Sequence, residues 1–119
     1  MITKEDIIAV VGASKNPRKY GNEVMRDLIS KGYTVYPVNP NEDKILELKS
    51  FKNLKSINAK IDFVVFVVPP EITEKVLEEV KKLKIPKVWM QPGSESEKAI
   101  KFCEDNKIEC IHNSCIMFN

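Results

Sequence analysis

The sequence is poor in the residues that mark several classes of protein. Its three cysteines show no C-x-x-C spacing, and with one histidine they indicate neither a disulfide framework nor a metal site. The longest apolar run, 63–70, is far shorter than the roughly 18 residues that a membrane span requires. A net charge of +2 gives no concentrated basic excess of the kind that binds nucleic acid. The polar N-terminus lacks the apolar core of a signal peptide, so we expect a cytoplasmic protein with no metal, membrane or nucleic-acid partner.

What is present favours one ordinary globular domain, residues 1–119. The chain has 43% hydrophobic and 30% charged residues, and 119 residues suffice for a single core. Apolar runs predict strands at 7–11, 33–38, 63–68, 87–91 and 108–111. Helical patterns open near Gly21, Glu71 and Ser94, where Ser94 and Glu97 suggest a capping box with Ser94 as N-cap. Residues 41–60 predict only a short turn or helix and an irregular segment on the sheet edge.

The alternation of strands and helices predicts an α/β fold. We expect a Rossmann-like, doubly wound parallel sheet of about five strands, in the order 3-2-1-4-5, with helices on both faces. Ligands of such sheets bind beyond the carboxyl ends of the strands. Four loops that follow strands are unusual in composition: Gly12-Ala13-Ser14, Val38-Asn39-Pro40, Val68-Pro69-Pro70 and Gln91-Pro92-Gly93.

The first of these loops predicts a site for a polyanion. Gly12 and Ala13 allow close approach of the backbone, and Ser14 adds a hydroxyl donor. Arg18 and Lys19 place two cations beside a helix N-terminus, near Tyr20-Gly21.

A nicotinamide dinucleotide is the obvious ligand, but its fingerprint is missing. The G-x-G-x-x-G pattern requires glycines where this chain has Ser14 and Pro17. The acid that binds the ribose hydroxyls is replaced by Asn39 or Pro40. The P-loop pattern fails as well, because no Gly-Lys-Ser/Thr follows Gly12.

The stretch 12–21, GASKNPRKYG, resembles the G-A-S-x-x-P-x-K-x-G motif of the small, stand-alone CoA-binding proteins. Their single domain is similar to the CoA-binding domain of the succinyl-CoA synthetase α subunit. The resemblance continues through 32–40, Asp62 and the Val68-Pro69-Pro70 loop, 88–93 and 113–116. Departures from the family pattern are Glu47, Asn58, Ser114 and the end of the chain at Asn119.

The resemblance implies that the chain binds coenzyme A or an acyl-CoA. The pyrophosphate would lie against the Gly12-Ala13-Ser14 loop with Pro17, Lys19, Tyr20 and Gly21. Val38-Asn39-Pro40 would line the adenosine end, with Arg18 or Lys19 available for the 3′-phosphate. Val68-Pro69-Pro70 and Gln91-Pro92-Gly93 would form the far wall, along the pantetheine arm.

Two other functions stay open on the sequence alone. One is a nicotinamide- or adenine-nucleotide-binding sensor, and the other is a thiol-dependent acyl-CoA enzyme that uses Cys115. His112 lies near Cys115 in sequence, but no residue can be assigned to orient the pair. We therefore expect a binding module without catalytic residues, with a protein partner or a second copy of the chain as a further possibility.

Overall fold

A computed structural model describes residues 2–118, so the predictions that involve Met1 and Asn119 lie outside the described residues. The strands are β1 Ile7–Val11, β2 Thr34–Val38, β3 Lys44–Ile45, β4 Leu48–Lys49, β5 Phe63–Phe66, β6 Lys87–Met90 and β7 Glu109–Ile111. The α-helices are α1 Tyr20–Ser30, α2 Pro70–Lys82 and α3 Glu97–Asp105. Two 3₁₀ helices, η1 Leu54–Ser56 and η2 Ile116–Phe118, complete the elements of the described residues. The predicted α/β fold is confirmed, with strand ends that differ by one or two residues.

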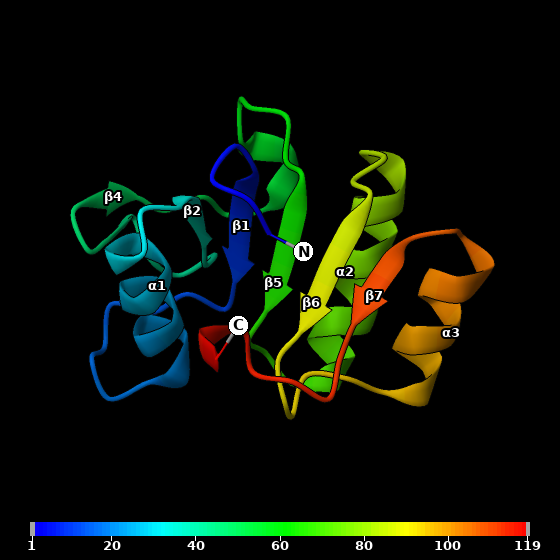
Figure 1. The fold of residues 1–119 in the computed structure, drawn as a ribbon. Helices are drawn as coiled ribbons and strands as arrows, with labels where there is room; N and C mark the ends of the chain where they lie inside the picture. The colour runs from blue at the N-terminus through cyan, green and yellow to red at the C-terminus, as the bar shows by residue number, and fades with distance from the viewer. Residues whose placement is uncertain (1, 119) are drawn as a thin grey trace.

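Five strands form one parallel sheet in the order β2-β1-β5-β6-β7 (Figure 1). Counted along the chain without the small β3–β4 pair, this order is 2-1-3-4-5, so the predicted order 3-2-1-4-5 is wrong. The physical reason lies in β5, whose four residues are all buried and belong in the centre of a sheet, not at its edge. Asp62 fixes this pairing: its carboxylate accepts from the Ile7 N–H at 2.9 Å, and its own N–H donates to the Ile7 carbonyl at 2.9 Å.

Helices cover both faces of the sheet, as the doubly wound fold requires. On one face α1 packs Val24, Met25 and Leu28 against the strands, together with Ile116 of η2. On the other face α2 and α3 bury Leu77, Val80 and other apolar side chains. Figure 1 shows α1 on one side of the sheet and α2 and α3 on the other. No helix within residues 2–118 is long and apolar enough to cross a membrane.

The segment after β2 contains the β3–β4 hairpin and then η1. Phe51 returns beside the end of β2, where its N–H donates to the Pro37 carbonyl at 3.0 Å and its carbonyl accepts from Asn39 at 2.9 Å. Leu54 and Ile57 anchor the segment in the core. A mostly irregular segment thus lies on the sheet edge, and it places Lys52 beside the loop that follows β2.

The helix α3 begins two residues later than the capping-box pattern predicts. Ser96 is its N-cap, and the Ser96 hydroxyl accepts from the Ala99 N–H at 3.0 Å. The Ser94 hydroxyl instead accepts from the Val68 N–H at 3.0 Å. Ser94 belongs instead to a turn at Pro92-Gly93. Its N–H closes this turn by donating to the Gln91 carbonyl at 2.8 Å, and this holds Ser94 away from the helix start. Ser94 therefore ties the end of β5 to the loop after β6.

Candidate functional site

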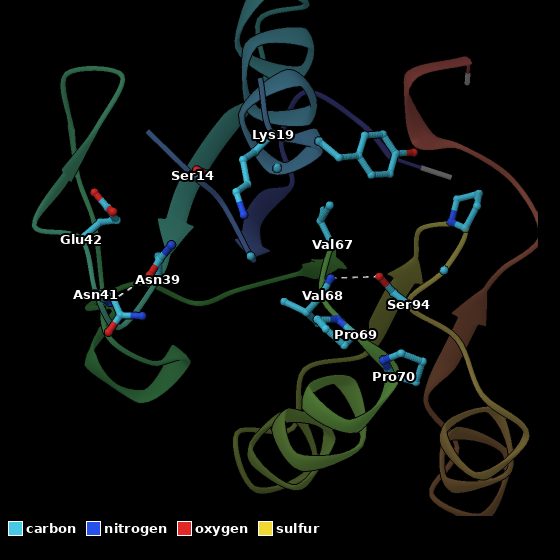
Figure 2. A pocket seen from close by; sticks show the side chains of 15 residues that line it. Ser14, Lys19, Asn39, Asn41, Glu42, Val67, Val68, Pro69, Pro70 and Ser94 are labelled. Atoms are coloured by element: carbon cyan, nitrogen blue, oxygen red, sulfur yellow. Dashed lines mark hydrogen bonds between the residues drawn. The ribbon is translucent and has the colours of Figure 1, made fainter. Parts of the chain in front are cut away.

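A cavity of about 690 Å³ opens at the carboxyl ends of β1, β2, β5 and β6 (Figure 2). We call it the main cavity. Most of the predicted binding residues line it: Gly12, Ser14, Lys19, Tyr20, Gly21, Asn39, Val68, Pro69, Pro70, Pro92 and Gly93. The loops after β1, β5 and β6 thus meet in one cavity, and the fourth unusual loop, after β2, contributes Asn39 to it.

Two glycines shape the wall of the main cavity. Gly12 has φ +98°, and a Cβ at this position would lie 2.1 Å from the Val67 carbonyl oxygen. A Cβ at Gly21 would lie 1.9 Å from the Gly12 carbonyl oxygen, so only glycine allows α1 to begin this close to β1. The result is bare backbone against which a ligand can pack, as in other nucleotide-binding turns between a strand and a helix.

Two helix N-termini face the main cavity. The cavity is lined by Lys19, the N-cap of α1, and by Pro69, the N-cap of α2. Neither cap residue makes a side-chain capping hydrogen bond, so neither helix start is neutralised by its own cap. The positive ends of both helix dipoles and the Lys19 ammonium favour an anion at this point.

A smaller, mainly apolar cavity of about 320 Å³ lies next to the first, and we call it the side cavity. The two cavities share Gly12, Asn39 and Val68. The other residues of the side cavity are Val11, Val38, Pro40, Lys52, Asn53, Leu54, Ile72, Val76 and Glu79. Two predicted residues, Val38 and Pro40, are therefore found here and not in the main cavity.

Four predicted residues line neither cavity. Ala13 is fully buried, and its carbonyl accepts from the Asn39 side-chain amide at 2.8 Å, which holds the loops after β1 and β2 together. Pro17 and Arg18 are exposed on the loop before α1. Gln91 is fully buried, and its role is to position its neighbours.

Gln91 organises a cluster that also contains Tyr20 and Cys115. Its Nε2 donates to the Tyr20 hydroxyl at 2.7 Å and contacts the Cys115 sulfur at 3.3 Å, while its Oε1 accepts from the Ile116 N–H at 2.8 Å. The Tyr20 hydroxyl lies 3.1 Å from the Cys115 sulfur. Burial, and then the hydrogen bond with Cys115, raise the pKa of Tyr20 to about 12.

The contact between Tyr20 and Cys115 joins the end of the chain to the wall of the main cavity, and nothing in their sequence spacing indicated it. Within residues 2–118, His112 makes no hydrogen bond to Cys115, and its buried Nδ1 has no partner. The two residues therefore do not form the nucleophile–base pair that catalysis through the thiol would use.

Sequence reasoning missed four residues of the main cavity: Asn41, Glu42, Val67 and Ser94. Glu42 matters most, because it brings a carboxylate into a site that was expected to lack one. Lys15 forms an ion pair with Glu42 at 3.4 Å and offsets part of this charge. The acid follows β2 by four residues, so a search limited to Asn39 and Pro40 could not find it.

Comparisons with known proteins identify the family of the chain. A family model described as CoA binding domain matches residues 6–119. The chain is 40% identical over 71 residues to the α subunit of an ADP-forming acetate–CoA ligase II from Pyrococcus furiosus, covering 59% of this chain and 16% of that subunit. It is 33% identical over 109 residues to the uncharacterized protein YneT of Bacillus subtilis, covering 92% and 81% of the two chains.

A solved structure agrees over nearly its full length. The conserved hypothetical protein from Pyrococcus furiosus has a TM-score of 0.91 and 45% identity, and the match covers 95% of this chain and 97% of that one. The chain spans only a small part of the ligases that it matches, 16% of one and 10% of another. Since the family model covers nearly the whole chain, the protein belongs to the CoA-binding domain family.

Proposed function

We propose that the chain binds coenzyme A or an acyl-CoA as one unit and performs no catalysis of its own. One observation carries the proposal: two helix N-termini and bare glycine backbone line one cavity, and an apolar cavity continues from it. A ligand with a diphosphate in the middle and an aromatic base at one end fits this pair of cavities. Membership in the CoA-binding family supports CoA over other nucleotides.

The three parts of CoA correspond to three parts of the site. The diphosphate would bind at Gly12 and the start of α1, where backbone N–H groups and Lys19 meet it. The adenine would enter the side cavity between the loop after β2 and the start of α2. The pantetheine arm would then leave along Pro69-Pro70 and Pro92-Gly93.

A thiol-dependent enzyme that uses Cys115 is a less favoured alternative. Cys115 contacts Tyr20, which lines the main cavity, so a thiol-dependent enzyme would have its nucleophile close to the ligand. Within residues 2–118 no base accompanies the sulfur, since both of its hydrogen-bond partners there are the neutral groups of Tyr20 and Gln91. Binding without turnover therefore fits the site better.

A dinucleotide or adenine-nucleotide sensor is the second candidate, and Glu42 favours it. A carboxylate beyond the second strand accepts hydrogen bonds from free ribose hydroxyls in dinucleotide sites. Glu42 lines the main cavity, although Lys15 already binds its carboxylate. The missing glycines at Ser14 and Pro17 count against this candidate.

A calorimetric titration of ligand-free protein with CoA, dephospho-CoA, NAD and NADP separates these candidates. We expect CoA to bind at least about tenfold more tightly than NAD, a difference of about 1.4 kcal/mol. Equal or tighter binding of NAD would overturn the CoA proposal in favour of the sensor. In a separate activity assay, steady acyl transfer that disappears in Cys115→Ala would instead establish the thiol-dependent enzyme.

A further inference from the structure

The adenosine end of the proposed CoA site carries a cation that the sequence motifs did not indicate. Lys52 lines the side cavity, together with Pro40 and Asn53. Its ammonium donates to the Pro40 carbonyl at 3.2 Å, so the side chain lies across the loop that follows β2. The bridge between Val38 and Phe51 brings the two segments together and fixes this position.

The two cations that the motif offered are placed differently. Lys19 is the N-cap of α1 and lines the main cavity, where the diphosphate would lie. Arg18 is exposed and lines neither cavity. Of these three cations, Lys52 is the one that lines the side cavity, where the adenine would lie.

Lys52 is also free to bind an anion. Among residues 2–118, no carboxylate lies within ion-pair distance of its ammonium. Glu79 is the acid that shares the side cavity, and its two oxygens accept from the Leu54 N–H at 3.1 Å and the Lys55 N–H at 2.9 Å. Glu42, the acid of the main cavity, is paired with Lys15. Both neighbouring acids thus have partners of their own.

From this placement, and resting on the proposed function, we infer that Lys52 binds the 3′-phosphate of CoA and sets the preference for CoA over nucleotides without that group. The adenine packs in the side cavity, and the ribose lies at its mouth where Pro40 holds Lys52. A charge-assisted bond from an ammonium to a phosphate is stronger than one between neutral groups. Lys52 is then a specificity residue, while Lys19 contributes to every ligand that carries the diphosphate.

The test is a set of calorimetric titrations with CoA and dephospho-CoA on the full chain. Wild-type protein should prefer CoA by about tenfold at low salt, and the preference should shrink as salt is added. Lys52→Gln should abolish the preference and leave dephospho-CoA binding within about twofold of wild type. Lys19→Gln should weaken both ligands alike and keep the preference.

Lys55→Gln is the matched control, because Lys55 lies on the same segment but lines neither of the two cavities. Its titrations should equal those of wild type. A preference that survives in Lys52→Gln, or that is lost in Arg18→Gln instead, overturns the assignment while CoA binding stands. Wild-type protein that binds neither ligand overturns the proposed function, and the role of Lys52 with it.

Discussion

The two cavities that meet at Gly12 are built in different ways. The main cavity takes much of its wall from one continuous stretch, residues 12–21, in which glycine geometry and a helix start provide the binding groups. The side cavity is assembled from side chains that are far apart in sequence, such as Val38, Leu54 and Ile72. A site made of local backbone can be recognised as a motif, whereas a site made of distant side chains depends on how the elements pack.

The same difference predicts how substitutions act. A change at the shared backbone of Gly12 should disturb both cavities and the fold together, because that residue packs directly against Val67 and Val68, which follow β5. A change to a partly exposed side chain of the side cavity, such as Ile72, should alter the affinity for the base and little else. Stability and binding are thus coupled at the Gly12 backbone and separable at an exposed side chain of the side cavity.

The largest effect is expected for Gly12→Ala. The new Cβ would meet the Val67 carbonyl oxygen at 2.1 Å, and alanine at φ +98° is strained as well. Each cost is roughly 1–3 kcal/mol, so urea denaturation should show a loss of about 2–6 kcal/mol in unfolding free energy. Calorimetry at a temperature where the variant is folded should show CoA affinity lowered by more than about tenfold.

Gly32→Ala provides the control for backbone strain alone. Gly32 also has positive φ, +87°, but its Cβ would meet only the Lys4 side chain at 3.9 Å, and Gly32 lines neither cavity. It should lose about 1–2 kcal/mol of stability and keep wild-type affinity. If Gly12→Ala also kept its affinity, the close backbone approach would not belong to the ligand site.

A moderate effect is expected for Ile72→Ser in the side cavity. Ile72 is 39% exposed without ligand, and a bound adenine would cover part of this exposed surface. Losing this contact should cost about 1 kcal/mol, or about fivefold in affinity, for CoA and dephospho-CoA alike. Leu83→Ser is the matched control, because Leu83 is 42% exposed at the other end of α2 and lines neither cavity. Equal losses in the two variants would argue against the base lying in the side cavity.

The elements of the fold were predictable where the sequence signal is local. The apolar run of β5 and the amphipathic helices gave the α/β class without ambiguity. The predicted strand order was wrong, because the order depends on whether the chain, after the irregular segment that follows β2, places β5 next to β1 or next to β2. The deciding contact, Asp62 with Ile7, joins residues 55 positions apart and leaves no periodic signal.

The site divides along the same line. Gly12, Lys19 and Gly21 were predicted from the motif and do line the main cavity. Lys52 and Glu42 were missed because they come from the segment that the sequence describes least well. The ligand contacts themselves stay predictions, and the titrations above are designed to test them.

The smallest effect concerns Tyr20, at the edge of the main cavity beside Cys115. Its pKa of about 12 in the folded protein is higher than the ordinary value of 10.0, chiefly because the phenol is partly buried. The folded protein therefore keeps this proton at a pH where the unfolded chain releases it. The stability that Tyr20 contributes is complete below pH 10.0 and is lost as the pH rises toward about 12.

A titration of phenolate absorbance should show one late step that is missing in Tyr20→Phe, and the variant should lose less stability over that pH range. Because the hydrogen bond with Cys115 also raises this pKa, Cys115→Ala should move the late step to lower pH. Cys110→Ala, on β7, is the control and should leave the step in place. An unmoved step in Cys115→Ala would mean that the thiol contributes nothing to the environment of Tyr20. A moved step would show that Cys115 contributes to the electrostatic environment of Tyr20 at the wall of the main cavity.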